Sequence, residues 1–253
     1  MTVQLLVAAL AQEKNALLEK LNVQSDAIVA NQCDKNEFEA FEWRGHAIRY
    51  LNLAERGVGL NRNNALMRAS GDVCLLADDD MTYVDGYPQL VEKTFEELPD
   101  ADVLIFNLIE KTPTRPVITR VGRVRFYNYL RYGAARIAFK TAAVRQNGIY
   151  FNQCFGGGTE HCHGEDNIFL AQCLKRGLKV YAVPKNIAEL TEERPSGWNR
   201  GYDEKYLKDQ GCLYRQLSRR WWRLLCLQDA LRHSGEYNMK WTRAYSVMKG
   251  QKD

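Results

Sequence analysis

Three adjacent aspartates, Asp78, Asp79 and Asp80, directly follow the apolar run at residues 73–77. Such a run predicts a buried strand, so the charges begin where this strand leaves the core. Adjacent carboxylates repel one another, and a divalent cation such as Mg²⁺ or Mn²⁺, which prefers oxygen ligands, removes that repulsion. Because ligands of open α/β sheets bind outside the carboxyl ends of the strands, the position favours a metal site over a solvated turn.

Glu165 and Asp166 form a second acidic site, at the predicted start of a helix. Asp166 could serve only as the N-cap of this helix, a role that suits aspartate. That role explains neither the neighbouring Glu165 nor the glycine run 156–158, which we expect to form a mobile loop. A carboxylate beside such a loop suits a general base that must admit a substrate.

Two further patterns are weaker. Gly57 and Gly59 precede a predicted helix whose first turn holds Arg62, which favours an anion, although a plain helix entry would look similar. Two cysteines and two histidines lie around the glycine run: Cys154, His161, Cys162 and His163. They lack the paired CxxC units of zinc sites, so unliganded side chains are favoured over a zinc ion.

The elements that must position these residues alternate between short strands and helices. Strands are predicted at residues 3–9, 27–30, 47–51, 73–77, 103–108, 136–139 and 180–183. Helices are predicted at 13–21, 61–70, 87–98 and 166–176, and a long loop at 112–132. This alternation predicts an α/β fold with a mainly parallel central sheet. From residue 206 onward we expect further helices, one of which includes the basic and aromatic segment 219–223.

Composition limits the class of protein. The 253 residues are 45% hydrophobic and 26% charged, as in an ordinary globular protein, and no apolar stretch reaches the length of a membrane span. Residues 2–11 lack the basic flank of a signal peptide and predict a strand. Seven scattered cysteines favour reduced thiols over a disulfide framework. The net charge of +4 permits a phosphate-bearing substrate or an anionic membrane surface.

The order of these motifs resembles the inverting glycosyltransferases of family 2, which have the GT-A fold. Residues 55–72 look like the glycine, arginine-asparagine and alanine pattern of that family, and the aspartate triplet looks like its DxD motif. Residues 151–158 look like its acceptor loop, and residues 164–166 look like its ED motif. The resemblance covers roughly residues 1–200, and the shared order of four motifs makes it fairly specific.

The resemblance implies a role for each of these residues. Asp78 and Asp80 would hold the metal and the donor diphosphate, with Asp80 as the more direct ligand. Asp166 and Glu165 would be the catalytic residues, with Asp166 as the base and Glu165 shaping the acceptor site. The other residues expected to bind the donor are Ala8, Asp34 at the nucleobase, Arg62, Asp79 and Trp198. The residues expected to border the acceptor are Gly156, Gly157 and Gly158.

The resemblance also implies a domain plan and an activity. A Rossmann-like GT-A domain, with helices on both faces of its sheet, would span residues 1–205, and a helical C-terminal extension would span 206–253. The domain would divide into a nucleotide-sugar half at 1–110 and an acceptor half at 111–205. We expect an enzyme of bacterial polysaccharide synthesis that uses Mn²⁺ or Mg²⁺ to transfer a sugar, from a UDP-sugar, to a saccharide or lipid-linked saccharide.

The sequence also indicates where the protein acts and leaves two alternative functions. We expect the protein in the cytoplasm, or peripherally on the inner face of the cytoplasmic membrane through residues 219–223, and we expect no nucleic-acid partner. A nucleotidyltransferase is one alternative, but residues 8–11 after the first strand are not the glycine-rich phosphate loop it would need. The other alternative is a module of the same fold that binds a nucleotide or glycan without turnover.

Overall fold

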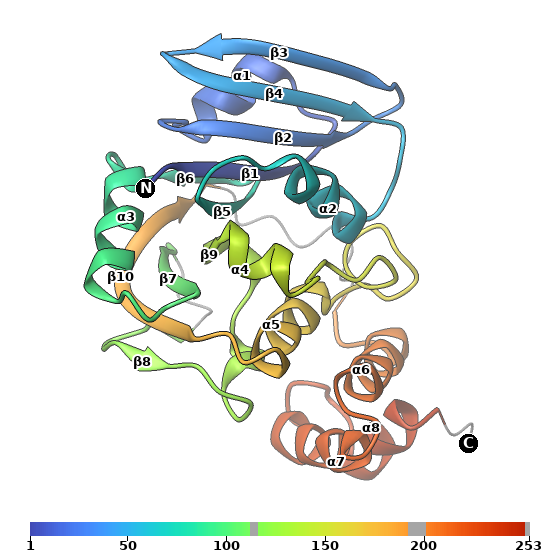
Figure 1. The fold of residues 1–253 in the computed structure, drawn as a ribbon. Coiled ribbons are helices and arrows are strands. Elements are labelled where there is room, and N and C mark those ends of the chain that lie inside the picture. Colours follow the sequence, from blue (N-terminus) through green and yellow to red (C-terminus); the bar gives the residue numbers. More distant parts are fainter. Residues whose placement is uncertain (112–115, 192–200, 251–253) are drawn as a thin grey trace.

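The computed structural model describes residues 1–111, 116–191 and 201–250, and one ten-stranded sheet runs through it (Figure 1). The strands are β1 (Val3–Leu10), β2 (Asp26–Gln32), β3 (Glu37–Trp43), β4 (His46–Leu53), β5 (Val73–Asp78), β6 (Met81–Tyr83), β7 (Val103–Ile109), β8 (Gly122–Arg123), β9 (Ile137–Lys140) and β10 (Val180–Leu190). The helices are α1 (Lys14–Lys20), α2 (Val58–Arg68), α3 (Tyr87–Glu97), α4 (Thr141–Gln146), α5 (Glu165–Lys175), α6 (Glu204–Leu217), α7 (Trp222–His233) and α8 (Trp241–Met248). Two short 3-10 turns, η1 (Tyr129–Arg131) and η2 (Ala134–Arg136), precede β9.

Most strands of the sheet point in one direction. Their order is β3-β4-β2-β1-β5-β9-β7-β10-β6, and β8 pairs with β10. The pairs β4–β2, β2–β1, β1–β5 and β7–β10 are parallel, whereas β9 lies antiparallel between β5 and β7. Because β9 is antiparallel to both neighbours, β7 and β10 point the same way as β1. This arrangement confirms the predicted α/β fold with a mainly parallel sheet.

Helices cover both faces of the sheet, and each face has its own core. In β1, Leu6 packs into a cluster that includes buried side chains of α2, α4 and α5. Leu5 and Val7 pack into a second cluster, which includes side chains of α1 and α3. Successive strand residues point to opposite faces, so a continuous apolar run marks a strand that is buried on both sides.

The parallel strands end at one edge of the sheet, and the aspartate triplet lies there. In the β1–β5 ladder, Ala8 lies opposite Asp78, the last residue of β5. The chain then turns through Asp79 and Asp80 into β6, which pairs with the end of β10. The backbone N of Thr191 donates to the carbonyl oxygen of Asp80 at 3.0 Å. The triplet is therefore fixed between β5, in the middle of the sheet, and the end of the sheet formed by β10 and β6.

Several element boundaries differ from the prediction. Strand β3 was missed because it lies at an edge, where exposed or half-buried glutamates alternate with aromatic or small residues and no apolar run forms. The three-residue β6 was also missed. Strand β10 continues to Leu190, past the predicted end at residue 183. Within the predicted loop, the structure places β8 and η1, and residues 112–115 lie outside the described part.

The C-terminal helices correct one prediction. Segment 219–223 does not lie within one helix, because α6 ends at Leu217 and α7 begins at Trp222. Ser218 Oγ accepts a hydrogen bond from Trp221 N at 3.1 Å, a local turn that competes with continued helix. Buried side chains of α6, α7 and α8 belong to the same cluster as those of α5, so the extension packs directly on the sheet domain. Among the described residues, no helix is both long and apolar enough to cross a membrane.

Candidate active site

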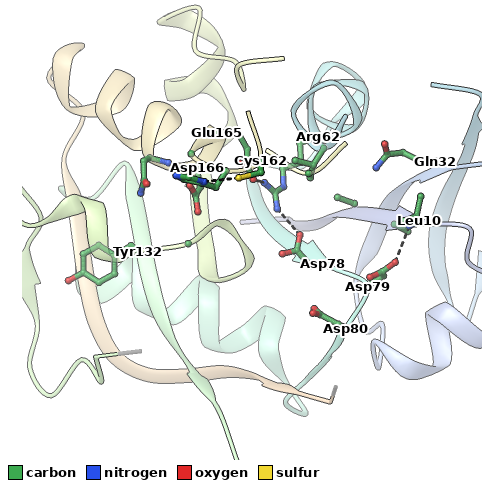
Figure 2. A pocket seen from close by; sticks show the side chains of 18 of the residues that line it. Leu10, Gln32, Arg62, Asp78, Asp79, Asp80, Tyr132, Cys162, Glu165 and Asp166 are labelled. Atoms are coloured by element: carbon green, nitrogen blue, oxygen red, sulfur yellow. Dashed lines mark hydrogen bonds and ion pairs between the residues drawn. The ribbon is translucent and has the colours of Figure 1, made fainter. Parts of the chain in front are cut away.

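A cavity of about 870 Å³ lies at the carboxyl ends of β1 and β5 (Figure 2). It brings together the two acidic sites: Asp78, Asp79 and Asp80 line one part, and Glu165 and Asp166 line another. The cavity is also lined by Ala8, Gln12, Gln32, Arg62, Leu130, Arg131, Tyr132, Gly133, Gly157 and His163. The residues expected to bind a metal and the residue expected to act as base thus face one space.

The three aspartates have different surroundings. Asp78 Oδ1 accepts a hydrogen bond from Arg62 Nη2 at 2.7 Å, and Asp79 Oδ2 accepts one from Leu10 N at 3.0 Å. Burial, followed by the charges of Asp78 and Asp79, raises the pKa of Asp80 to about 6. Burial is also the main cause that raises the pKa of Asp79. Carboxylates are therefore crowded at this turn, and Asp80 holds its proton more tightly than an ordinary aspartate.

The donor set at this turn fits a divalent cation. Over the described residues, no three His, Cys, Asp or Glu side chains are placed to hold a metal by themselves. Mg²⁺ does not need such a cage, because it is usually bound by one or two carboxylates together with substrate phosphates and waters. A nearby cation favours the ionised form of a carboxylate, so it would relieve the raised pKa of Asp80.

Arg62 connects the two acidic sites. Its Nη1 donates to Glu165 Oε1 at 2.6 Å, its Nη2 donates to Asp78 as described above, and its guanidinium lies over the Phe151 ring at 5.5 Å. The residue is only 4% exposed. Burial by itself lowers the pKa of Arg62, but the charges of Asp78 and Glu165 outweigh it and raise the pKa. Arg62 is therefore a buried cation shared by two carboxylates.

This position differs from the predicted one. Helix α2 begins at Val58, so Arg62 lies in the second turn and not in the first. The side chain points at carboxylates of the protein and not outward from a helix N-terminus. The sequence could not show this, because Glu165 lies 103 positions away from Arg62.

Asp166 is the second residue of α5 and does not cap it. The N-cap is Gly164, at φ 108°, so the alternative in which Asp166 serves only as a cap is wrong. Asp166 Oδ1 instead accepts a hydrogen bond from Asn167 N at 2.7 Å. Burial, followed by the charge of Glu165, raises the pKa of Asp166 to about 7, although Arg62 opposes the rise. A carboxylate that binds a proton near neutral pH is well matched to general-base work.

The glycine run, which we expected to form a mobile loop, is held at two points by backbone hydrogen bonds. Val58 N donates to Gly157 O at 2.9 Å, and Gly156 N donates to His161 O at 2.8 Å. Gly156 has φ 99°, and a β carbon added there would lie 2.5 Å from Glu165 Oε2. Glycine is thus needed where the loop backbone meets the buried Glu165 carboxylate. Of the three glycines expected at the acceptor, Gly157 lines the cavity.

The residues expected to bind the donor nucleotide occupy different places. Ala8 lines the cavity, at the end of β1. Asp34 lies outside the lining, forms an ion pair with Arg56 at 2.6 Å, and has a side chain that is 96% exposed. Trp198 lies outside the described residues. The donor roles of these residues stay predictions.

Sequence reasoning missed two glutamines of this cavity. Gln32 is the last residue of β2 and is buried, and its Oε1 accepts a hydrogen bond from Gly57 N at 2.8 Å. Gln12 follows β1 and donates from its Nε2 to Leu10 O at 3.1 Å. Both stand where parallel strands end, and that position was a usable signal for ligand-facing residues.

The C-terminal helices reach the cavity through a chain of hydrogen bonds. His163 Nε2 and Gln210 Oε1 of α6 lie 2.6 Å apart, and Gln210 Nε2 donates to Asp229 Oδ2 of α7 at 3.0 Å. Asp229 is buried and also accepts hydrogen bonds from the hydroxyls of Tyr214 and Tyr237. Its carboxylate is satisfied on both oxygens, as burial requires. The extension thereby anchors the segment that leads into α5.

Comparisons with known proteins identify a family and similar folds. A family model described as glycosyl transferase family 2 matches residues 26–153. The structure of TarS residues 1–349 from S. aureus in complex with UDP-GlcNAc is similar in fold, with a TM-score of 0.66, 15% identity, and coverage of 99% of this chain and 93% of that chain. The same TarS fragment in complex with UDP gives a TM-score of 0.63 and 16% identity, with 98% and 75% coverage. A search of curated protein sequences gives no match.

Proposed function

The chain belongs to glycosyltransferase family 2, and we propose that it transfers a sugar from a uridine-diphosphate donor with inversion at the anomeric carbon. The observation that carries this proposal is that the aspartate triplet and Asp166 face one cavity, with Arg62 paired between them. The TarS complexes with UDP-GlcNAc and UDP support the donor class. The acceptor we propose is a saccharide or lipid-linked saccharide, as in polysaccharide synthesis.

We propose that Asp80 holds a divalent cation, Mn²⁺ or Mg²⁺, with Asp78 as a second carboxylate. Such a cation, when bound, neutralises the charge that develops on the leaving diphosphate. The crowded negative charge of the turn and the raised pKa of Asp80 support this assignment. Asp78 and Asp79 each already accept a hydrogen bond on one oxygen, from Arg62 and from Leu10 N respectively, which supports Asp80 as the most direct ligand.

Asp166 is the base in this mechanism. It accepts the proton of the acceptor hydroxyl while that oxygen attacks the anomeric carbon. The new carbon–oxygen bond forms opposite the departing diphosphate, whose bond to the sugar breaks and whose oxygen keeps the electron pair. One displacement of this kind inverts the configuration.

Glu165 and Arg62 act as positioning residues in the same proposal. Glu165 was expected to take part in catalysis, but its carboxylate is occupied by Arg62 and packed against the glycine run. Through this pair, Glu165 holds Arg62 beside Asp78, and it raises the pKa of the neighbouring Asp166. Both effects prepare the cavity without direct contact with the reacting atoms.

A sugar-nucleotide panel tests the function. The full chain with Mn²⁺ and saccharide acceptors should release UDP from one of the donors and form a product with inverted configuration. A nucleotidyltransferase would instead release pyrophosphate from a nucleoside triphosphate. A binding module would retain the donor without forming product. A product with retained configuration would reject the single displacement.

We also propose that segment 219–223 contacts an anionic membrane surface. Trp221 is 54% exposed, and the guanidinium of Arg220 lies over its ring at 5.1 Å. Trp222 is buried between Arg215 and Arg223, so Trp221 is the tryptophan of the pair available to a surface. An exposed tryptophan among arginines suits the interface of a bilayer that contains anionic lipids.

A further inference from the structure

A second cavity, of about 600 Å³, lies beside the first. Four arginines line it, and we call it the arginine groove after them: Arg120, Arg123, Arg125 and Arg131. Arg131 and Tyr132 line both this groove and the candidate active site, so the two spaces adjoin at these residues. The proposed reaction uses none of the other groove residues.

The groove adjoins the active site on the side of the proposed base. Asn167 Nδ2, next to Asp166 on α5, donates to Leu130 O in η1 at 3.3 Å. A β carbon added to Gly133 would lie 3.5 Å from Asp166 Oδ2. The segment shared by the two spaces therefore lies beside the residue that would deprotonate the acceptor. This places the groove where the rest of an acceptor would extend.

The positive charge of the groove is not neutralised by the protein. Its described lining contains no aspartate or glutamate, and none of the four arginines forms an ion pair within the described residues. Asp100 interacts electrostatically with Arg123, but its carboxylate is already paired with Lys179 at 2.7 Å. Like charges in one groove repel one another, so an anionic ligand would stabilise the arrangement.

Parts of the groove are held in place by hydrogen bonds. Arg123 lies in β8, which pairs with β10, and its guanidinium donates to Tyr181 OH at 3.3 Å and lies 5.0 Å from that ring. Arg131 Nε donates to Asn128 O at 3.1 Å, and Arg125 N donates to Asn128 Oδ1 at 2.8 Å. A planar guanidinium held in one direction recognises phosphate oxygens through paired hydrogen bonds.

We propose that the arginine groove binds phosphate groups of the acceptor, so that the acceptor of this enzyme is a phosphate-bearing glycan. The identity of this ligand as an acceptor rests on the proposed function. Two sources supply the same chemistry: a lipid diphosphate that carries a sugar, or a polymer joined by phosphodiesters. In both, the hydroxyl to be glycosylated lies at Asp166 while neighbouring phosphates lie on the arginines.

A binding experiment tests the groove without any transfer reaction. Inorganic tripolyphosphate is titrated into the full chain by calorimetry with EDTA present, because without a divalent cation the crowded carboxylates of the donor site should repel the probe. Arg120→Gln combined with Arg125→Gln removes two groove charges outside the active-site lining. Lys93→Gln combined with Arg176→Gln is the matched control, because it removes the same charge at exposed positions outside both cavities.

The groove variant should bind tripolyphosphate about tenfold more weakly or worse, since charge-assisted hydrogen bonds to phosphate are lost. The control variant should stay within about twofold of the unaltered chain, and UDP affinity and melting temperature should match in all three. Equal weakening by both variants, or no binding by the unaltered chain, would overturn the proposal. Absence of sugar transfer with intact tripolyphosphate binding would instead count against the proposed function.

Kinetics then identify the source of the phosphate. The same variants are assayed with a detergent-solubilised prenyl-diphosphate sugar and with a water-soluble phosphodiester oligomer. For the true acceptor class, the groove variant should raise the acceptor KM about tenfold, with kcat and the donor KM unchanged. An unchanged acceptor KM for both compounds would contradict the proposal, even if the groove bound tripolyphosphate.

Discussion

Arg62 and Glu165, which are 103 positions apart in the chain, form an ion pair of 2.6 Å in which both side chains are almost fully buried. Through its other terminal nitrogen, Arg62 also holds Asp78 at 2.7 Å. The pair therefore joins the strand-end aspartates to the start of α5, where Asp166 lies. The Arg62 guanidinium thus sets the position of the aspartate triplet relative to Asp166.

Arg62→Ala should destabilise the protein strongly. It leaves Glu165 buried without a partner, which costs about 3–5 kcal/mol in the free energy of unfolding. Arg56→Ala is the control, since it removes an exposed ion pair of the same 2.6 Å length and should cost less than about 1 kcal/mol. Urea denaturation of the two variants measures both values. Equal stabilities would contradict the structural role of Arg62.

The kinetics of the same variant report on the donor side. Where Arg62→Ala remains folded, Asp78 loses the guanidinium that orients it. The Michaelis constant for the donor should therefore rise. A change confined to the acceptor constant would show that Arg62 does not support the donor site.

Removal of the divalent cation should abolish most of the affinity for UDP. Without it, the diphosphate meets the crowded carboxylates of Asp78 and Asp80 directly. Calorimetric titration of UDP with and without EDTA measures this loss, and Asp80→Asn should behave like chelation. Asp85→Asn serves as a control, because Asp85 lies outside the cavity lining and is paired with Asn22 and Gln24. Undiminished UDP binding in EDTA would refute the metal role.

The pH profile should show the titration of Asp166. The base must be ionised to accept a proton, and burial and Glu165 raise its pKa to about 7. In the acid limb, kcat should therefore fall about tenfold for each pH unit below the pKa. The profile is measured at saturating donor and acceptor. A carboxylate with an ordinary pKa of about 4 would stay ionised from pH 5 to 8 and give a flat profile, which would contradict this prediction.

The raised pKa of Asp166 also affects the stability of the folded protein. Low pH lowers kcat, but it favours the folded state. The folded state binds the Asp166 proton more tightly than the unfolded chain, whose ordinary value is 3.8. This contribution to stability is fully present below that value and is lost as the pH rises to about 7. Asp166→Asn, measured in EDTA at pH 8, should therefore melt at a higher temperature than the unaltered chain. A lower melting temperature would mean that the ionised carboxylate is stabilising.

Local apolar patterns predicted many of the strands and helices. They could not predict ion pairs between residues that are far apart in the sequence. The run before Asp78 marked β5 because a strand buried on both faces needs apolar residues throughout. Strand β3 carries no such run, since its exposed edge tolerates alternating glutamates. The aspartate triplet and Asp166 were found from their positions at element ends. The partner of Arg62 was not, because only the folded chain brings Glu165 beside α2.

Segment 219–223 should bind anionic vesicles at low salt. Each basic residue near such a surface contributes about 1 kcal/mol, and the attraction weakens as salt screens it. Co-sedimentation with vesicles that contain phosphatidylserine should exceed that with neutral vesicles, and Trp221→Ala should weaken it. Trp241→Ala is a control, because this second exposed tryptophan begins α8 and does not belong to segment 219–223. No sedimentation at low salt would rule out the contact.

Asp166→Asn provides the most direct test of the account. The amide keeps the size of the side chain and an oxygen that can accept the Asn167 hydrogen bond, but it cannot take a proton from the acceptor. Transfer by the purified variant is measured at saturating UDP-sugar and Mn²⁺, with UDP affinity checked in parallel. We expect kcat to fall by about two to four powers of ten while donor affinity is retained. Transfer at nearly the unaltered rate by a folded variant would show that Asp166 is not the base.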